Sequence, residues 1–161
     1  MAAFDEAKRL GLRITAHAGE ASGAESVREA LDVLHAERIG HGYRVLEDEK
    51  VYERVLRDDV HMELCLTSSM QTGAQPSLAE HACRRFVTDG ANVGLNTDDP
   101  SVCGTTMLKE FEVAVNECGL QRSALGVLTF NAARSCFLPD AEKAELLARL
   151  RKVWTGECEC K

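Results

Sequence analysis

The sequence has no apolar run that approaches the ~18 residues of a membrane-spanning helix, and no positively charged segment followed by an apolar one near its start. These absences predict a cytoplasmic protein without direct membrane insertion. Proline is scarce, with three residues in 161, and no stretch rich in Pro, Gly or Ser divides the chain. We therefore expect a single domain.

Basic residues are in the minority, because 19 Lys and Arg stand against 26 Asp and Glu, for a formal net charge of −7. This balance argues against a nucleic-acid partner. Hydrophobic residues make up 45% of the chain and charged residues 28%, which is the composition of a globular protein and excludes a disordered one.

The seven cysteines do not form a disulfide framework, because their number is odd and most lie far apart. Cys158 and Cys160 lie at the extreme C-terminus, and the sequence assigns them no role. The other five lie singly in segments patterned as buried strand or helix and are predicted to be free thiols: Cys65, Cys83, Cys103, Cys118 and Cys136.

Short extended segments alternate with helical ones along the chain. Apolar residues recur with the spacing of one helix face at 27–34, 79–86, 107–118 and 146–154. The extended candidates lie at 13–16, 38–40, 62–66 and 92–95. Since none shows the long alternation of a two-faced antiparallel strand, we expect an α/β fold with a parallel sheet covered by helices.

A helix is also predicted at the start of the chain, with Gly11 at the position that often ends a helix. In a β/α series such a helix follows a strand, and none precedes this one, so we expect the chain to begin inside a larger repeat. The predicted organisation is one domain over 1–161, with a leading helix at 1–10, βα units at 12–105, C-terminal helices at 106–155 and a tail at 156–161.

Four polar clusters each follow a predicted strand. Positions 17, 41, 68 and 98 within them are spaced by about one βα unit. Because the carboxyl ends of strands in a parallel barrel meet at one rim, the clusters are predicted to form one pocket. They are His17-Ala-Gly-Glu20, His41-Gly-Tyr43, Ser68-Ser69 and Asn96-Thr-Asp98-Asp99-Pro100.

Histidine and carboxylate side chains in one pocket indicate zinc, which at a catalytic site takes about three such ligands plus water. The neighbours Asp98 and Asp99 are also suggestive, since adjacent like charges cost free energy unless a cation neutralises one or each has a partner. Glu20 lies three residues after His17, which suits a proton donor beside a metal ligand.

Each cluster has a structural alternative when it is taken alone. A histidine at a strand end is often only a hydrogen-bonded structural residue, Ser68-Ser69 is typical of a cap or turn, and Asp-Asp-Pro often begins a helix with Pro100 in the first turn. Four clusters at four successive strand ends nevertheless favour a site. Three further histidines lie off this pattern, the last within a predicted helix, and are interpreted as surface or packing residues: His35, His61 and His81.

The clusters and their surroundings resemble the animal-type adenosine deaminase family, within the metal-dependent adenosine and AMP deaminases. The resemblance runs from about residue 4 to residue 154. It implies a (β/α)8 TIM barrel, of which this chain would supply about four parallel strands, the last four of the eight, plus C-terminal helices. The phrases that carry it are Thr15-Ala-His-Ala-Gly-Glu20, Arg38-Ile-Gly-His-Gly-Tyr43, Ser68-Ser-Met-Gln-Thr-Gly-Ala74, Leu95-Asn-Thr-Asp-Asp-Pro100 and Asn131-Ala-Ala-Arg-Ser-Cys-Phe-Leu-Pro139.

Carried over position by position, the resemblance implies that His17 and Asp98 bind Zn²⁺. Glu20 would protonate the purine ring at N1, and His41 would orient and deprotonate the attacking water. Substrate binding is assigned to Asp99, through N7 of the base, and to Gly19. The implied reaction is the zinc-dependent hydrolytic deamination of adenosine or 2′-deoxyadenosine, small purine nucleosides, to inosine or deoxyinosine and ammonia.

Two features depart from the family pattern. Leu66 and Thr67 stand where the animal enzymes usually have Pro and Trp, which predicts an altered wall of the pocket. The His-x-His pair that the family's first strand supplies to zinc occurs nowhere in the 161 residues. This second departure predicts that the chain alone is inactive.

The alternatives left open are a catalytically dead, truncated isoform that acts as a binding or regulatory fragment, and an unrelated α/β domain. Half a barrel would also leave two open sheet edges and an exposed inner face. We therefore expect the chain to self-associate or to pair with a missing N-terminal half.

Overall fold

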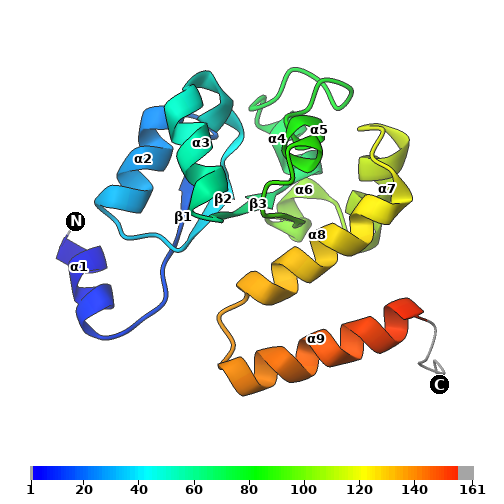
Figure 1. Ribbon diagram of the computed structural model, residues 1–161. Helices are drawn as coiled ribbons and strands as arrows, with labels where there is room; N and C mark the ends of the chain where they lie inside the picture. Colours follow the sequence, from blue (N-terminus) through cyan, green and yellow to red (C-terminus); the bar gives the residue numbers. More distant parts are fainter. Residues whose placement is uncertain (1, 156–161) are drawn as a thin grey trace.

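Four parallel strands form the centre of the computed structural model, which describes residues 2–155. They lie in one sheet in the order β1-β2-β3-β4, and helices connect them (Figure 1). Each strand overlaps a predicted segment, so the predicted parallel α/β arrangement is confirmed. The strands are β1 (Thr15–Ala18), β2 (Arg38–His41), β3 (His61–Leu64) and β4 (Val93–Leu95).

The helices fill the crossovers and continue beyond the last strand. One of them is shorter than the sequence predicts, since the apolar stripe at 79–86 is helical only from Cys83 onward. His81 therefore lies in the preceding loop, where its Nδ1 accepts a hydrogen bond from the Cys83 N–H at 3.0 Å, and the prediction that it lies within a helix is wrong. The helices are α1 (Ala2–Arg9), α2 (Ala24–Asp32), α3 (Glu49–Arg57), α4 (Leu66–Gln71), α5 (Cys83–Thr88), α6 (Pro100–Cys103), α7 (Met107–Asn116), α8 (Arg122–Ser135) and α9 (Asp140–Thr155), with a 3₁₀ helix, η1, at Tyr43–Glu47.

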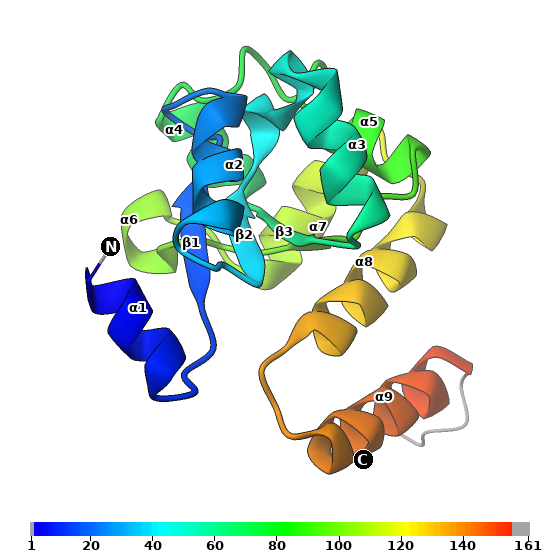
Figure 2. The same ribbon diagram turned by 60° about the vertical axis from the view of Figure 1, so that its left-hand side comes forward.

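The leading helix α1 stands away from the sheet, joined to it by an extended segment (Figure 2). None of its residues is fully buried. Gly11 ends the helix as predicted, with φ of +70° and its N–H donating to the Lys8 carbonyl at 3.0 Å. A side chain rarely adopts this left-handed conformation, which explains a glycine here.

The two faces of the sheet differ in polarity because successive side chains of a strand point to opposite sides. Ile39, Met62 and Leu64 are fully buried in the main core, against helices such as α2, α3 and α5. The opposite face is polar. There the Thr15 hydroxyl lies 3.4 Å from Oε1 of Glu63, and the Arg38 guanidinium forms an ion pair with the same carboxylate.

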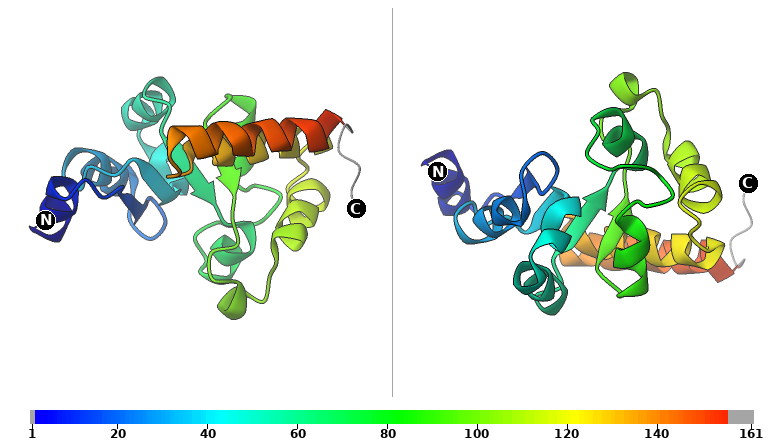
Figure 3. Two further views of the ribbon diagram at one scale, coloured as in Figure 1. Left: turned by 90° about the horizontal axis from the view of Figure 1, so that it is seen from below. Right: turned by 90° about the horizontal axis from the view of Figure 1, so that it is seen from above.

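Helices α8 and α9 pack side by side across the amino-terminal ends of the strands, as the view from below shows (Figure 3). Gly126 permits this packing, because a Cβ at that position would overlap the ring of Trp154. At its other end α8 is tied to the sheet, since the Asn131 side chain donates to the Val93 carbonyl at 3.4 Å.

The cysteines follow the prediction where the structure describes them. Four are free and buried, and Cys136 is free but half-buried. Cys158 and Cys160, with the predicted tail, lie outside the described residues. Within 2–155 no helix combines the length and the apolar character needed to cross a membrane.

Candidate metal and catalytic site

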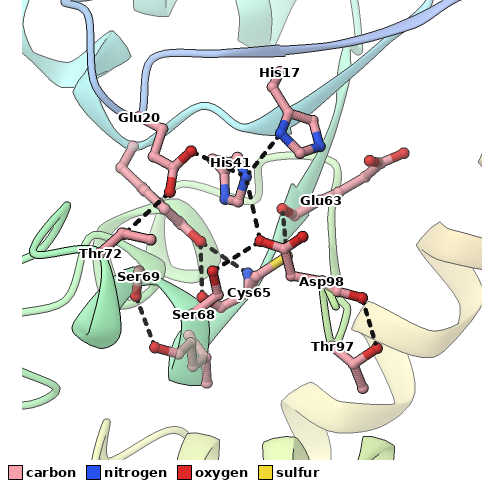
Figure 4. A network of polar contacts seen from close by, with 12 residues as sticks. His17, Glu20, His41, Glu63, Cys65, Ser68, Ser69, Thr72, Thr97 and Asp98 are labelled. Atoms are coloured by element: carbon pink, nitrogen blue, oxygen red, sulfur yellow. Dashed lines mark hydrogen bonds and ion pairs between the residues drawn. The ribbon is translucent and has the colours of Figure 1, made fainter. Parts of the chain in front are cut away.

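Side chains from three strand ends meet at the carboxyl edge of the sheet. His17 lies in β1, His41 ends β2, and Asp98 follows β4. One ligand atom of each residue can be chosen so that all three lie within 4.8 Å of one another (Figure 4). The structure thus brings together residues that are up to 81 positions apart in the sequence.

His41 lies at the centre of this group and is 1% exposed. Its Nε2 is 3.3 Å from Nδ1 of His17 and 3.7 Å from Oδ2 of Asp98. The same nitrogen is 3.3 Å from Oε2 of Glu20, which comes from the loop after β1. Glu20 therefore joins the predicted cluster.

Burial lowers the pKa of His41, because the charged ring loses its hydration. The carboxylate of Glu20 acts in the opposite direction but does not reverse the shift. His41 is therefore a neutral ring at pH 7. Its Nδ1 is buried and has no hydrogen-bond partner among residues 2–155, which leaves one ring nitrogen for a group from outside that part of the chain.

The backbone is strained at two of these residues. His41 has φ of 68° and Asp98 has φ of 58°, both in the left-handed region that non-glycine residues rarely adopt. Such conformations cost on the order of 1–3 kcal/mol each and concentrate at functional sites. Both residues lie where the chain leaves a strand, and His35 and Asp59 adopt the same conformation away from the site.

Two hydroxyl groups, one in α4 and one at its C-terminal end, hold the carboxylates of Asp98 and Glu20. Ser68 donates to Oδ2 of Asp98 at 2.7 Å, and Thr72 donates to Oε1 of Glu20 at 3.1 Å. Ser69, the other member of the predicted pair, points elsewhere: its hydroxyl donates to the Leu66 carbonyl and lies 3.0 Å from Nε2 of His81. Thr72 was not among the predicted site residues, because nothing local in the sequence marks it.

Two glycines shape the loops around His17. A Cβ at Gly40 would overlap the His17 ring, so the glycine leaves the space in which that ring lies. Gly19 has φ of +65°, and its N–H donates to the Ser26 hydroxyl at 2.8 Å. This bond gives Gly19 a place in the turn between β1 and α2, and its predicted role in substrate binding stays a prediction.

The two neighbouring aspartates separate. Asp98 points into the site, whereas Oδ1 of Asp99 accepts hydrogen bonds from the backbone N–H groups of Ser101 and Val102 and caps α6, with Pro100 in its first turn. The alternative interpretation of Asp-Asp-Pro, that it begins a helix, is therefore correct for Oδ1 of Asp99. Its predicted contact with the purine base stays a prediction.

We call His17, His41 and Asp98 the metal-ligating group. Two cavities lie next to this group and Glu20. One of about 340 Å³ is lined by His17, His41 and Asp98 and by Asn96 of the same predicted cluster, together with Glu63 and Met107, which were not predicted to lie at the site. The other, of about 710 Å³, lies on the far side of Glu20 next to Thr72 and Tyr43.

Leu66 and Thr67, where the sequence predicts an altered pocket wall, line neither of these two cavities. Leu66 is fully buried in the core. The Thr67 backbone N–H donates to the Glu110 carboxylate at 3.2 Å, on the side of α7. Both residues belong to the first turn of α4, and the predicted change of the pocket wall stays a prediction.

The residues present fit a small divalent cation. The imidazole of His17 and the carboxylate of Asp98 offer a nitrogen and an oxygen donor of the kind that Zn²⁺ takes, and they lie close enough to share one ion, with His41 beside them. A hydrogen bond from Ser68 orients the carboxylate of Asp98, and such a bond to a metal ligand is usual around metal sites.

Comparison with solved structures defines the class of protein. The chain matches an adenine deaminase from Arthrobacter aurescens with a TM-score of 0.89 and 37% identity, over 94% of this chain and 46% of that one. A Burkholderia ambifaria amidohydrolase with bound Zn matches with a TM-score of 0.87 over 96% of this chain and 43% of that one; at 24% identity it shows the fold alone. The chain has the fold of part of a (β/α)8 barrel of the amidohydrolase and deaminase class.

The particular family follows from the sequence comparisons. The family model described as adenosine deaminase matches residues 1–153, and the chain belongs to this family. It is 44% identical to an adenosine deaminase of Mus musculus over 152 residues, which are 94% of this chain and 43% of the relative. The chain therefore spans less than half the length of the curated relatives it matches.

Proposed function

We propose that this chain carries metal-binding and proton-transferring residues of an adenosine deaminase, which hydrolyses the 6-amino group of adenosine or 2′-deoxyadenosine to give inosine or deoxyinosine and ammonia. The observation that carries the proposal is the gathering of His17, His41 and Asp98, with Glu20 beside them. Because the chain spans less than half of its relatives, the activity is proposed for the whole protein to which these residues correspond.

In this proposal His17 and Asp98 hold the metal ion as a nitrogen and an oxygen ligand. A bound Zn²⁺ supplies Lewis acidity, which makes water a competent nucleophile near neutral pH. His41 orients the attacking water and accepts its proton, because the buried ring is neutral at pH 7.

Glu20 is proposed to give a proton to N1 of the purine, which makes the neighbouring C6 more electrophilic. The geometry supports this role, since Thr72 holds one carboxyl oxygen while the other faces His41. Asp99 is proposed to hold the base through N7 with the carboxylate oxygen that does not cap α6.

A second function is favoured by one feature of the sequence: no His-x-His pair occurs in its 161 residues. On its own the chain would then offer few ligands to the metal, since catalytic zinc takes about three from the protein. In this alternative the chain is a catalytically inactive binding or regulatory fragment.

Metal binding and turnover test the proposal together. The metal-free chain is titrated with Zn²⁺, and ammonia release is measured with adenosine, deoxyadenosine and adenine as substrates. We expect saturable Zn²⁺ binding that His17→Ala and Asp98→Ala abolish, while His35→Ala, a histidine remote from the site, leaves it unchanged.

Turnover that is lost in Glu20→Gln would support the deaminase, and Zn²⁺ binding without turnover would favour the inactive fragment. Zn²⁺ binding that survives both His17→Ala and Asp98→Ala would contradict the proposed site. Comparison of adenosine with adenine separates nucleoside from base as substrate, a choice that the named relatives leave open.

We further propose that the open edges of the sheet bind another polypeptide, either a second copy of this chain or the preceding part of the barrel. Support comes from β1, which among residues 2–155 pairs only with β2, and from the exposed Thr15 and His17 on it. Light scattering of the purified chain tests this, since a monomer at all concentrations would exclude the second copy. An N-terminal fragment of a deaminase is then added to the chain. If the measured mass does not increase, the preceding part of the barrel is excluded as the partner.

A further inference from the structure

A third cavity, also of about 340 Å³, lies at the end of the sheet opposite the metal-ligating group. It opens among the segment before β1, the first residues of β2 and β3, and the α8–α9 pair, which covers the amino-terminal ends of the strands (Figure 3). We call it the basal cavity. None of the residues proposed for deamination lines it.

The basal cavity is rich in cations on a chain whose net charge is −7. Four basic side chains from distant segments line it, against the two carboxylates of Glu37 and Asp59. His61 adds no positive charge at neutral pH, because burial lowers its pKa. The four basic residues are Arg13, Arg38, Arg134 and Lys143.

Two of the four cations are already engaged and form a wall. Arg13 donates to both carboxylate oxygens of Glu37, at 2.7 and 2.8 Å, and Arg38 is paired with Glu63. Both guanidinium groups also lie over the ring of Phe137, at 4.6 and 5.0 Å from its centroid. These contacts hold Arg13 and Arg38 in place, but they leave Nε of Arg38 without a hydrogen-bond partner.

The other two cations are free to bind a ligand. Among residues 2–155 the Lys143 ammonium makes no hydrogen bond or ion pair, although the residue is half-buried. Arg134 makes a 3.3 Å hydrogen bond to Oδ1 of Asn131, one turn away on its own helix, and its guanidinium lies 5.9 Å from the centroid of the Phe130 ring; it has no ion pair among residues 2–155. Both groups therefore keep donors available to an anion.

An unsatisfied donor lies in the same wall. Only two buried side-chain polar atoms of residues 2–155 lack a hydrogen-bond partner, Nδ1 of His41 in the metal-ligating group and Nε of Arg38 here. Buried donors are almost always paired in folded proteins, so an orphan indicates an acceptor that completes the site. The side chains of Ser135 and Asn92 add neutral polar groups.

We propose that the basal cavity binds an oxyanion of the phosphate class, held by Arg134 and Lys143 against the wall formed by Arg13 and Arg38. An anion with several oxygens matches separate ammonium and guanidinium donors, which pair readily with phosphate. The volume is at the lower end of that of small-molecule sites and admits a phosphate with a small attached group. The proposal does not depend on the deaminase activity, because no residue is shared.

The test is a calorimetric titration of the metal-free chain with inorganic phosphate, in a chelating buffer at low ionic strength. The chelator removes any metal to which phosphate could bind. We expect saturable binding with a dissociation constant of about 1 mM or tighter. The double substitution Arg134→Gln/Lys143→Gln should weaken it at least tenfold, while Arg28→Gln/Lys50→Gln, which removes the same charge from exposed positions, should change it less than twofold.

Three results would overturn the proposal: no saturable binding, equal weakening in the two double variants, or displacement of phosphate by adenosine, which carries no phosphate. Unchanged thermal unfolding of the Arg134→Gln/Lys143→Gln chain checks that it is folded. If it does not fold, phosphate-induced amide shifts in the ¹⁵N spectrum of the unsubstituted chain decide, since they should fall at Ser135 and Arg38 and not at His41. A parallel titration with AMP distinguishes a nucleotide phosphate, which should bind more tightly, from the free ion.

Discussion

The Ser68 hydroxyl donates a 2.7 Å hydrogen bond to Oδ2 of Asp98, the same oxygen that faces His41. A residue of α4 thus holds a carboxylate that follows β4, 30 positions later in the chain. The bond limits the rotation of the Asp98 side chain, so the carboxylate is oriented before any ligand arrives.

Ser68→Ala should therefore weaken Zn²⁺ binding by about 10–100-fold, the usual effect of losing a group that orients a metal ligand. Competition with a fluorescent zinc chelator measures the change. Ser101→Ala removes an equal hydroxyl from an exposed position in α6 and should have no effect. Equal affinities of the Ser68→Ala and unsubstituted chains would show that Ser68 does not position Asp98.

Gly40→Ala should displace the His17 ring, because the added methyl group would overlap it. We expect Zn²⁺ affinity to fall at least tenfold while the chain remains folded. Gly73→Ala is the control: its φ of +71° makes a side chain unfavourable by ~1 kcal/mol, yet no atom lies near the new methyl group. The Gly73→Ala variant should lose some stability and keep its metal affinity. If Gly73→Ala weakened Zn²⁺ binding and Gly40→Ala did not, Gly40 would not be the residue that leaves space for the His17 ring.

Acid should destabilise the chain through His81, whose pKa burial lowers from 6.5 to about 4. The unfolded chain binds the proton more readily than the folded one, so stability is complete above pH 6.5 and falls as the pH drops toward 4. The full loss from this residue is about 3 kcal/mol, from 1.36 kcal/mol per pKa unit. His61, also buried with a lowered pKa, acts in the same direction.

Urea unfolding at pH 7 and pH 5 measures this dependence. In His81→Gln the amide can still bond to Ser69 but does not titrate in this range. The difference in unfolding free energy between the two pH values should shrink by about 2 kcal/mol relative to the unsubstituted chain. An unchanged difference would show that His81 is not the residue that senses pH.

Glu110→Ala should destabilise the fold by about 2–4 kcal/mol, because it leaves buried donors unpaired. Glu110 is 0% exposed and accepts from the Thr105 hydroxyl at 2.6 Å and from the Thr67 N–H at 3.2 Å, which joins α7 to α4. Glu112→Ala, on the exposed face of the same helix, should cost less than about 0.5 kcal/mol. Thermal and urea unfolding compare the two, and similar losses would argue against the buried contact.

The sequence by itself determined the alternation of strands and helices and the four polar clusters that follow the strands. Both are local properties, because hydrophobic periodicity and turn residues depend on neighbours within a few positions. From them the parallel sheet and the meeting of His17, His41 and Asp98 could be predicted. Family resemblance, and not periodicity, supplied the expected roles of these residues.

Only the tertiary structure decided which member of each pair points toward His41. Asp98 and Ser68 point inward, while an oxygen of Asp99 caps a helix and Ser69 bonds to His81. It also decided that Thr72 holds Glu20 from 52 positions away. Directions of side chains follow from helix phase, backbone strain and packing between distant segments, and these are set only when the strands and helices are assembled.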